Sequence, residues 1–358
     1  MRGGNGMMNR SSGYSKLLSQ MNLPSRVCAV VAMLTTLLCV SGCAPRANEP
    51  RAKAALERHE YVQGLMGVQV RLVMYTTDEE TAKTAAKSAF ERVAELEGVM
   101  SDYQRDSELM QLCDKAGDGP VRVSPELFDI LEYAQQVSQA SDGAFDATVG
   151  PLVRLWRESR KTQTLPDPPA LAEARSLVGY QFMRLDRKKQ TVELTMPGMR
   201  LDLGGIGKGY AGDEAIRVLR EQGVTSALFE AGGDIVVSDA PPEHPDGWQI
   251  ETQEGKKIPL ANVAISTSGY TEQFVEIHGV PYSHVVDPHT GIGLTNQFAA
   301  TIIARRGITT DALSTAATVL GPERSQALLK RFAARGSIRK VAPETTSRQT
   351  STTSQANP

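Results

Sequence analysis

Residues 201–210 read Leu-Asp-Leu-Gly-Gly-Ile-Gly-Lys-Gly-Tyr, and they say more about the fold than any other stretch of this chain. The pattern predicts a strand over 200–203 that turns tightly into a helix over 208–222. One glycine suffices for such a turn, whereas four let the backbone pass close to a ligand. N–H groups at a helix start favour an anion, and Lys208 adds a positive charge. We interpret the stretch as an anion-binding turn; the alternative is a tight turn with a solvent-exposed lysine.

Two nucleotide-binding patterns come close to this stretch. A Walker A loop needs Gly at position 202 and Ser or Thr at position 209, where this chain has Asp and Gly. The spacing Gly207-x-Gly209-x-x-Gly212 satisfies the dinucleotide fingerprint, and Glu230 ends a later strand where a ribose-binding acid would lie. The preceding strand is not a buried apolar run, which disfavours a nicotinamide oxidoreductase but leaves it as an alternative.

Outward from this stretch, both structural periods occur along the chain. Residues 68–74 alternate as a half-buried strand does, and apolar residues over 82–96 recur at helical spacing. Ser124-Pro125 predicts an N-cap followed by proline in the first helical position. Further strands are expected near 182–186, 191–194, 227–230, 235–237, 247–251, 263–267, 273–277, 283–286 and 298–304, with helices over about 310–320 and 322–334. Because strands come in runs, an α+β fold is favoured over a regular βαβ winding.

The N-terminus has the features of a lipoprotein leader. Residues 27–40 form a 14-residue, mainly apolar run preceded by basic residues. A membrane span needs about 20 apolar residues, so the run is typical of a signal-peptide core. Val40-Ser41-Gly42-Cys43 resembles a bacterial lipobox, although ordinary cleavage near Ala44 is an alternative. Acyl chains on Cys43 would anchor the protein to a membrane.

We therefore divide the chain into a lipoprotein signal peptide (1–42), a polar tether (43–60), a folded domain (61–336) and a disordered tail (337–358). Without residues 1–42 the chain has 35 basic and 41 acidic residues, a net charge of about −6. No basic stripe exists to neutralise phosphates, which argues against nucleic acid as a partner. Three of the four cysteines precede position 44, so no disulfide framework is expected.

Three short motifs combine small residues with polar ones. Gly143-Ala144-Phe145-Asp146 is either a pocket wall open to an aromatic ligand or a helix end with Phe145 in the core. Gly232-Gly233-Asp234 is a second glycine turn, whose aspartate either binds a ligand or caps the turn. Thr267-Ser268-Gly269 is the third motif, and we consider it together with a later stretch, residues 282–291, that contains a histidine and a turn.

In that later stretch, His284 and Asp287 bracket two apolar residues, and residues 287–291 have the composition of a turn. The chain has only five histidines, and we interpret His284 as functional; the alternative is a satisfied surface residue. Asp311 and Thr315 are four residues apart, so on a helix they share one face. Their oxygens suit Mg²⁺, although Asp311 could instead cap the helix start and Thr315 bond back to a carbonyl.

Taken together and in this order, these motifs resemble the ApbE family of FAD:protein FMN transferases, from about Met66 to Phe332. Further matching pieces are Met66-Gly67, Ser101-x-Tyr103 and Asp106-Ser107-Glu108-Leu109. The chain departs from the family pattern at Cys113, Ala231 and Tyr270-Thr271, none of which belongs to the expected metal site.

The resemblance implies an α+β fold related to the T-fold, in which the domain over 61–336 is catalytic and holds FAD in a cleft. The cofactor-binding residues it implies are Met66, Tyr103, Ala144, Phe145, Asp146, Asp202, Lys208, Gly232, Gly233, Asp234, Thr267, Ser268 and Gly269. Mg²⁺ would lie between the Gly205 carbonyl, Asp311 and Thr315, near the pyrophosphate. His284 is the expected proton-handling residue, with Asp287 orienting it or a ligand hydroxyl.

The implied reaction is a Mg²⁺-dependent transfer of the FMN moiety of FAD to a Thr or Ser hydroxyl of a partner protein, with release of AMP. The partner is expected to be a subunit of a membrane redox complex, and the enzyme to be lipid-anchored on the periplasmic side of the inner membrane. Two further alternatives are an FAD pyrophosphatase and a periplasmic FAD-binding protein without catalysis. An intact Asp311–Thr315 pair favours catalysis, because binding alone needs no metal at the pyrophosphate.

Overall fold

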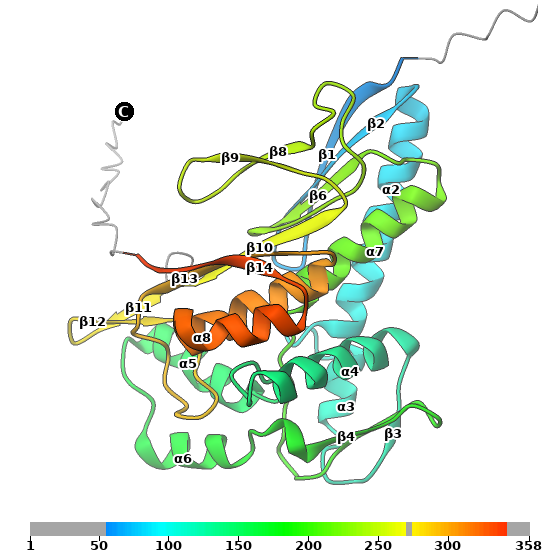
Figure 1. The fold of residues 1–358 in the computed structure, drawn as a ribbon. Helices are drawn as coiled ribbons and strands as arrows, with labels where there is room; N and C mark the ends of the chain where they lie inside the picture. Colours follow the sequence, from blue (N-terminus) through cyan, green and yellow to red (C-terminus); the bar gives the residue numbers. More distant parts are fainter. Residues whose placement is uncertain (1–54, 270–273, 342–358) are drawn as a thin grey trace, which may run out of the picture. The chain divides into compact units, whose positions relative to one another are not determined.

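The computed structural model describes residues 55–269 and 274–341, and its centre is a seven-stranded sheet (Figure 1). The strand order is β1-β2-β6-β7-β10-β13-β14, and each neighbouring pair is antiparallel. The strands are β1 (Glu57–Leu65), β2 (Val68–Thr76), β6 (Ala227–Ala231), β7 (Asp234–Val237), β10 (Val263–Gly269), β13 (Phe298–Ala304) and β14 (Arg335–Lys340). A dinucleotide-binding fold needs parallel strands joined by crossover helices, so the nicotinamide alternative is wrong.

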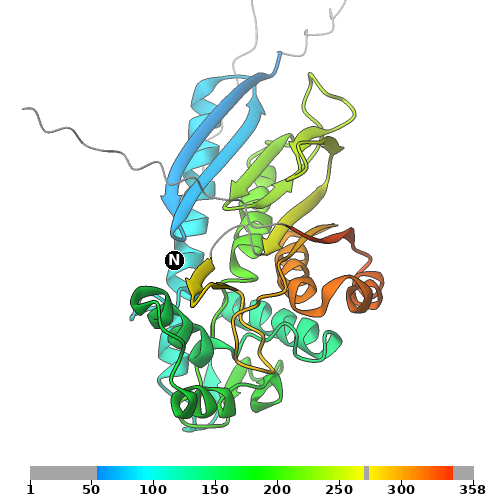
Figure 2. The same cartoon turned by 90° about the vertical axis from the view of Figure 1, so that its left-hand side faces the viewer.

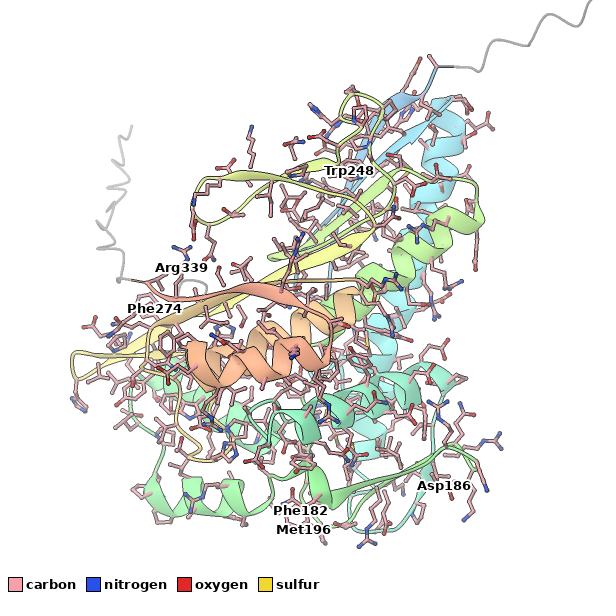
Figure 3. The ribbon with its side chains drawn as sticks, viewed as in Figure 1. Phe182, Asp186, Met196, Trp248, Phe274 and Arg339 are labelled. Carbon is pink, nitrogen blue, oxygen red and sulfur yellow. The ribbon has the colours of Figure 1, made fainter. Side chains whose placement is uncertain are left out.

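Three helices, α2 (Glu79–Met100), α7 (Gly207–Glu221) and α8 (Gly307–Arg331), cover one face of this sheet (Figures 1 and 2). Alternate residues of β2 point to opposite faces of the sheet and belong to different hydrophobic clusters. Leu72 and Met74 are fully buried against the helices, whereas Tyr75 belongs to a separate cluster on the opposite face. There the hairpin of β8 (Trp248–Glu251) and β9 (Lys257–Leu260), with Trp248 labelled in Figure 3, covers the sheet. The Trp248 ring lies 5.8 Å from the Tyr75 ring.

The remaining elements lie outside the seven-stranded sheet and its three covering helices. They are α3 (Glu108–Cys113), β3 (Val121–Arg122), α4 (Pro125–Ala140), α5 (Gly150–Thr162), α6 (Pro168–Ser176), the 3-10 helix η1 (Tyr180–Phe182), β4 (Met183–Asp186), β5 (Thr191–Leu194), β11 (Phe274–Ile277) and β12 (Val280–Ser283). As predicted, Ser124 caps α4, because its hydroxyl accepts the Leu127 N–H at 3.2 Å. The mixture of sheets and separate helices confirms the α+β fold.

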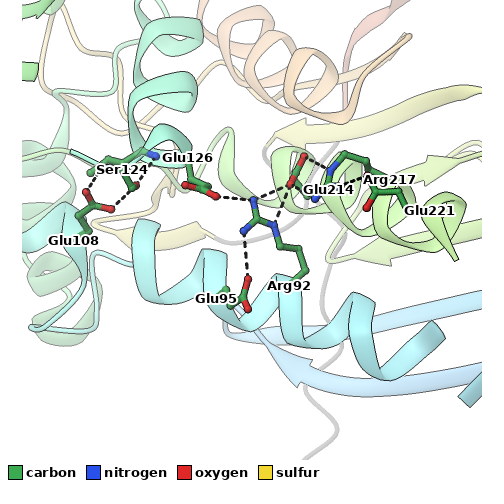
Figure 4. A network of polar contacts seen from close by, with 9 residues as sticks. Arg92, Glu95, Glu108, Ser124, Glu126, Glu214, Arg217 and Glu221 are labelled. Carbon is green, nitrogen blue, oxygen red and sulfur yellow. Dashed lines mark hydrogen bonds and ion pairs between the residues drawn. The ribbon is translucent and has the colours of Figure 1, made fainter. Parts of the chain in front are cut away.

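A polar network ties α2 to α4 and α7 (Figure 4). Arg92 of α2 donates to Glu126 of α4 at 3.1 Å and to Glu214 of α7 at 2.8 Å. Burial alone would lower the pKa of Arg92, but the surrounding glutamates outweigh it and the pKa is raised. The network therefore holds α2, α4 and α7 together.

Several predicted boundaries need correction. Residues 201–203 form no strand, and only Arg200 makes an isolated bridge, to Val149. The strand expected over 283–286 is displaced, since β12 spans Val280–Ser283. The expected tether and tail each overlap a strand: β1 begins at Glu57, and β14 continues to Lys340. Both are edge strands of the sheet, held by backbone pairing and mostly exposed, so they lack the apolar alternation that predicts strands.

The break between the two helices expected near the C-terminus is confirmed. Gly321 interrupts α8 with non-helical dihedral angles (φ 74°, ψ 177°), and Pro322 follows it. Over the described residues, no helix combines the length and the apolar character needed to cross a membrane. The expected signal peptide, Cys43 and residues 342–358 lie outside the described ranges.

Candidate functional site

A cavity of about 240 Å³, here called the flavin cavity, brings together segments that lie far apart in the sequence. Its walls come from the loop after α2, the loop after α4, helix α5, the glycine-rich turn, the ends of β6, β7 and β10, and helix α8. The predicted residues that line it are Tyr103, Ala144, Phe145, Asp146, Asp202, Gly205, Lys208, Gly232, Asp234, Thr267, Ser268, His284, Asp311 and Thr315. Met66 lines an adjoining cavity that shares Tyr103, Lys208 and His284 with the first. Gly233, Gly269 and Asp287 are in neither lining.

Helices α7 and α8 touch backbone to backbone beside this cavity. A Cβ on Gly209 would lie 2.1 Å from the carbonyl oxygen of Gly307, and a Cβ on Gly307 would lie 2.3 Å from that of Gly209. The close approach lets the Gly209 N–H donate to the Asp311 carboxylate at 3.0 Å. Asp213 of α7 accepts the N–H groups of Gly307 (2.6 Å) and Ile308 (3.1 Å). Thus Asp213 caps α8, and the alternative in which Asp311 caps its own helix is wrong.

Asp311 and Thr315 lie one turn apart on α8, and both face the flavin cavity. A Cβ on Gly205 would lie 2.8 Å from the Thr315 hydroxyl oxygen, so glycine allows the turn to approach this hydroxyl. Within the described part of the chain the Thr315 hydroxyl forms no hydrogen bond, and the expected alternative of a bond back to a carbonyl is not seen. One carboxylate, one hydroxyl and a nearby backbone carbonyl are hard oxygen donors that fit Mg²⁺.

This set needs oxygens from a ligand to complete a metal site. Among residues 55–269 and 274–341 there is no cluster of three or more His, Cys, Asp or Glu that could hold a metal ion. Mg²⁺ commonly keeps few protein ligands and takes further oxygens from substrate phosphates or water. The donor set therefore suits a metal that arrives with, or is shared by, a phosphorylated substrate.

Lys208 lies between two carboxylates at the same end of the cavity. Its Nζ is 3.0 Å from Asp234 and 4.0 Å from Asp311, and it donates to the Gly204 carbonyl at 3.2 Å. Helix α7 begins one residue earlier, at Gly207. A lysine beside a helix N-terminus offers positive charge and N–H donors to an anion.

Arg157 of α5 is a site residue that sequence analysis missed. It pairs with Asp102 and, at 3.0 Å, with Asp202, and its guanidinium carbon lies 4.2 Å from the centroid of the Tyr103 ring. Burial would lower the pKa of Arg157, but the two aspartates outweigh it and the pKa is raised. Burial, and then repulsion by Asp102, raise the pKa of Asp202. Arg157 therefore places one positive charge between two carboxylates of the cavity wall and supports the aromatic ring expected to contact the flavin.

Asp146, in the loop after α4, contributes to another part of the cavity wall. Its carboxylate accepts the N–H and hydroxyl of Thr148 at 2.8 and 2.7 Å, and the Tyr180 N–H at 2.7 Å. Burial raises the pKa of Asp146 despite these bonds. Phe145 lines the cavity and is only 4% exposed, so it belongs both to the core and to the cavity wall; its contact with an aromatic ligand stays a prediction.

The two residues expected to be catalytic are placed differently. His284 lines both the flavin cavity and the adjoining one. The Asp287 carboxylate instead accepts the His289 N–H at 2.9 Å and the Thr290 hydroxyl at 3.2 Å, within its own turn. These bonds account for the turn composition of residues 287–291 and give Asp287 a structural role.

The fold and the cavity define a class of protein, and the comparisons agree with it. The model of the ApbE family matches residues 66–337, so the chain belongs to the ApbE family. It is 31% identical over 326 residues to the FAD:protein FMN transferase of Treponema pallidum (strain Nichols), covering 84% of this chain and 88% of that relative.

Two solved structures agree with this family assignment. One is the Thermotoga maritima ApbE protein, with a TM-score of 0.71 and 29% identity over 79% of this chain and 97% of that one. The other is the apo form of the Pseudomonas stutzeri flavinyl transferase ApbE, with a TM-score of 0.69 and 27% identity over 79% and 90% of the two chains. The resemblance inferred from the motifs is therefore confirmed.

Proposed function

We propose that this chain transfers the FMN half of FAD to a Thr or Ser hydroxyl of a partner protein and releases AMP. The chain is a flavin transferase of the ApbE family. The observation that carries the finer proposal is the convergence of Lys208, the α7 N-terminus and the Asp311–Thr315 pair on one cavity. These groups suit a pyrophosphate, which is the part of FAD that must be cleaved.

In the proposed reaction the acceptor oxygen forms a bond to the FMN phosphorus, and the bond from that phosphorus to the AMP oxygen breaks. The hydroxyl proton passes to a base, for which we propose His284 because it lines both connected cavities. Lys208 and the N–H groups at the start of α7 would hold the pyrophosphate oxygens. Tyr103, supported by Arg157, and Met66 would contact the flavin.

The Gly205 carbonyl, Asp311 and Thr315 would hold Mg²⁺. When bound there, it would offset the negative charge of the pyrophosphate. The chain prepares this site itself, since the Gly209 N–H holds the Asp311 carboxylate at 3.0 Å. Lys208 adds a second positive charge at 4.0 Å from the same carboxylate.

The test is to incubate the purified full chain with FAD and Mg²⁺, with and without a Thr-bearing acceptor protein, and to follow AMP release and acceptor mass. We expect a flavin-sized mass gain that is lost with a chelator and in Asp311→Ala. Asp129→Ala, which removes an exposed carboxylate on α4, is the matched control and should transfer normally. AMP release without a mass gain would identify an FAD pyrophosphatase instead, and no AMP release would leave only flavin binding.

The role of His284 has its own test. His284→Ala should bind FAD as the wild type does but transfer FMN at least about 100-fold more slowly, the usual contribution of a general base. His244→Ala, in an exposed loop on the opposite face of the sheet, is the control. Wild-type transfer by His284→Ala would exclude His284 as the base.

We also propose that Cys43 is acylated and anchors the enzyme on the periplasmic side of the inner membrane, where a membrane redox subunit would be its acceptor. Support comes from the apolar run over 27–40 and the lipobox-like sequence that ends at Cys43. Cys43→Ser should move the protein from the membrane fraction to the soluble fraction. If the variant stays with membranes through detergent-free washing, another anchor must exist.

A further inference from the structure

A second cavity of about 490 Å³, here called the arginine cleft, adjoins the flavin cavity. Of the residues that line it, the reaction proposed above uses only Tyr103 and the Arg157 that supports it. Four arginines line it: Arg105, Arg154, Arg157 and Arg200. They come from three separate segments, the loop after α2, helix α5 and the residues before the glycine-rich turn. Such a concentration of one charge in a single cleft calls for a ligand or for internal acidic partners.

Internal partners neutralise only half of this charge. Arg157 pairs with Asp102, and Arg200 lies 3.4 Å from Asp114. Arg105 and Arg154 are exposed, and neither has an acidic partner among residues 55–269 and 274–341. The cleft thus keeps an excess of positive charge in a chain whose formal net charge is −2.

The position of the cleft relates this charge to the reaction. The arginine cleft and the flavin cavity share the wall formed by Asp102, Tyr103 and Arg157. Tyr103 is 74% exposed and lines both cavities. A polypeptide lying in the cleft would therefore reach the edge of the flavin cavity. Lys208 and Asp311, which would hold the pyrophosphate and the metal, line the flavin cavity and not the cleft.

We propose that the arginine cleft binds an acidic segment of the acceptor protein, next to the hydroxyl that receives FMN. This inference rests on the proposed transfer, because only a transferase needs to hold an acceptor chain at the cavity edge. Arginine suits the task, since its planar fork binds carboxylates in pairs of hydrogen bonds. Arg105 and Arg154 would supply these bonds, while Arg157 and Arg200 stay with their aspartates.

The test compares the wild type with a variant carrying both Arg105→Gln and Arg154→Gln. The binding probes are two fluorescent peptides of equal length with a central Thr, one flanked by Asp and one by Asn, measured by anisotropy at low and high salt. We expect the Asp peptide to bind about tenfold more weakly to the variant, and wild-type binding to weaken as salt rises. Arg324→Gln removes an exposed arginine on α8 and is the matched control. The dissociation constant for FAD should stay within about twofold of wild type in both variants.

With an acceptor protein, we expect the KM for the acceptor to rise about tenfold in the double variant while kcat changes little. Equal binding of the Asp peptide by wild type and double variant would overturn the proposal. Weaker FAD binding would overturn it too, by showing that the cleft holds part of FAD. So would arginine-dependent binding to phosphatidylglycerol vesicles without peptide binding, which would indicate a lipid surface. If the wild type binds the Asp peptide but transfers no FMN, the transferase proposal fails, and the cleft remains an acidic-peptide site.

Discussion

The crossing of α7 and α8 gives the sharpest prediction, because one missing side chain connects the packing of the fold to the site. A Cβ on Gly209 would lie 2.1 Å from the Gly307 carbonyl oxygen and 2.8 Å from the Asp311 Cβ. Ordinary contacts of a Cβ lie at 3.4–4 Å, and the nearest obstacle is backbone that cannot change rotamer. Gly209→Ala must therefore move α8 away from α7, by more than about 1 Å, the difference between these distances.

The energetic cost has three parts. Overpacking of this kind costs about 1–3 kcal/mol. Losing the Gly209 N–H bond to the buried Asp311 carboxylate costs about 1.5–3 kcal/mol. The better helix propensity of alanine returns about 0.5–1 kcal/mol. We expect a net loss of about 2–5 kcal/mol in the free energy of unfolding. Because Asp311 moves with α8, the transfer rate should fall about 100-fold.

Urea unfolding and the AMP-release assay measure the two effects. Gly98→Ala is the matched control, because Gly98 lies in α2 with nothing within 4 Å of the added Cβ. It should raise the free energy of unfolding by about 0.5–1 kcal/mol and leave transfer unchanged. If Gly209→Ala behaves like Gly98→Ala in both assays, the helices are not held at the distance that we describe, and the reasoning about Asp311 fails with it.

Three further predictions concern the cavity walls. Arg157→Met leaves Asp102 and Asp202 without their shared cation and should lower the free energy of unfolding by about 2–3 kcal/mol at neutral pH. This loss is smaller than for a fully buried pair, because the Arg157 side chain is 25% exposed. Since losing the cation raises the pKa of Asp202 further, urea unfolding should show a smaller difference from wild type at pH 5 than at pH 7. The pKa of Asp146 is raised from 3.8, so its carboxyl contributes stability below pH 3.8 that is lost as pH rises through the folded pKa. Asp146→Asn does not titrate, so urea unfolding from pH 4 to 7 should show its stability, relative to wild type, increasing with pH by at most about 1.4 kcal/mol per unit; a flat difference would exclude a raised pKa. Thr315→Val should raise the Mg²⁺ concentration for half-maximal transfer about tenfold without changing metal-free FAD binding, and an unchanged Mg²⁺ requirement would remove Thr315 from the metal site.

The sequence predicted those features of the fold that depend on interactions between residues close together in the chain. The N-cap at Ser124 and the break at Gly321 both depend on residues within one turn, and the structure has both. The buried stripe of α2 was visible because alanines and larger apolar residues recur at helical spacing. Most of the expected site residues do meet in one cavity. They could be predicted because the motifs were taken as an ordered set, although several motifs were ambiguous alone.

Features that depend on contacts between distant segments could not be predicted from local sequence patterns. Arg157 has no motif of its own, and its role depends on Asp102 and Asp202 approaching from other segments. The edge strand β14 is held by backbone pairing with β13, so its side chains carry little signal. Asp287 was expected to orient His284 or a ligand hydroxyl, but its carboxylate is used to hold the turn.

The glycine-rich stretch shows why motif and fold cannot be separated here. Its glycines were interpreted as room for a ligand, but the structure divides them between two tasks. Gly205 lets the turn approach the Thr315 hydroxyl at the cavity, whereas Gly209 lets α7 touch the backbone of α8. Farther along α7, a Cβ on Gly212 would lie 2.7 Å from the side chains of Phe229 and Val236 in the sheet. The packing contact carries Asp311 to the turn from about a hundred residues away and fixes its carboxylate through the Gly209 N–H. A substitution at a packing glycine should therefore damage the chemistry as well as the fold, which binding-site reasoning alone would not predict.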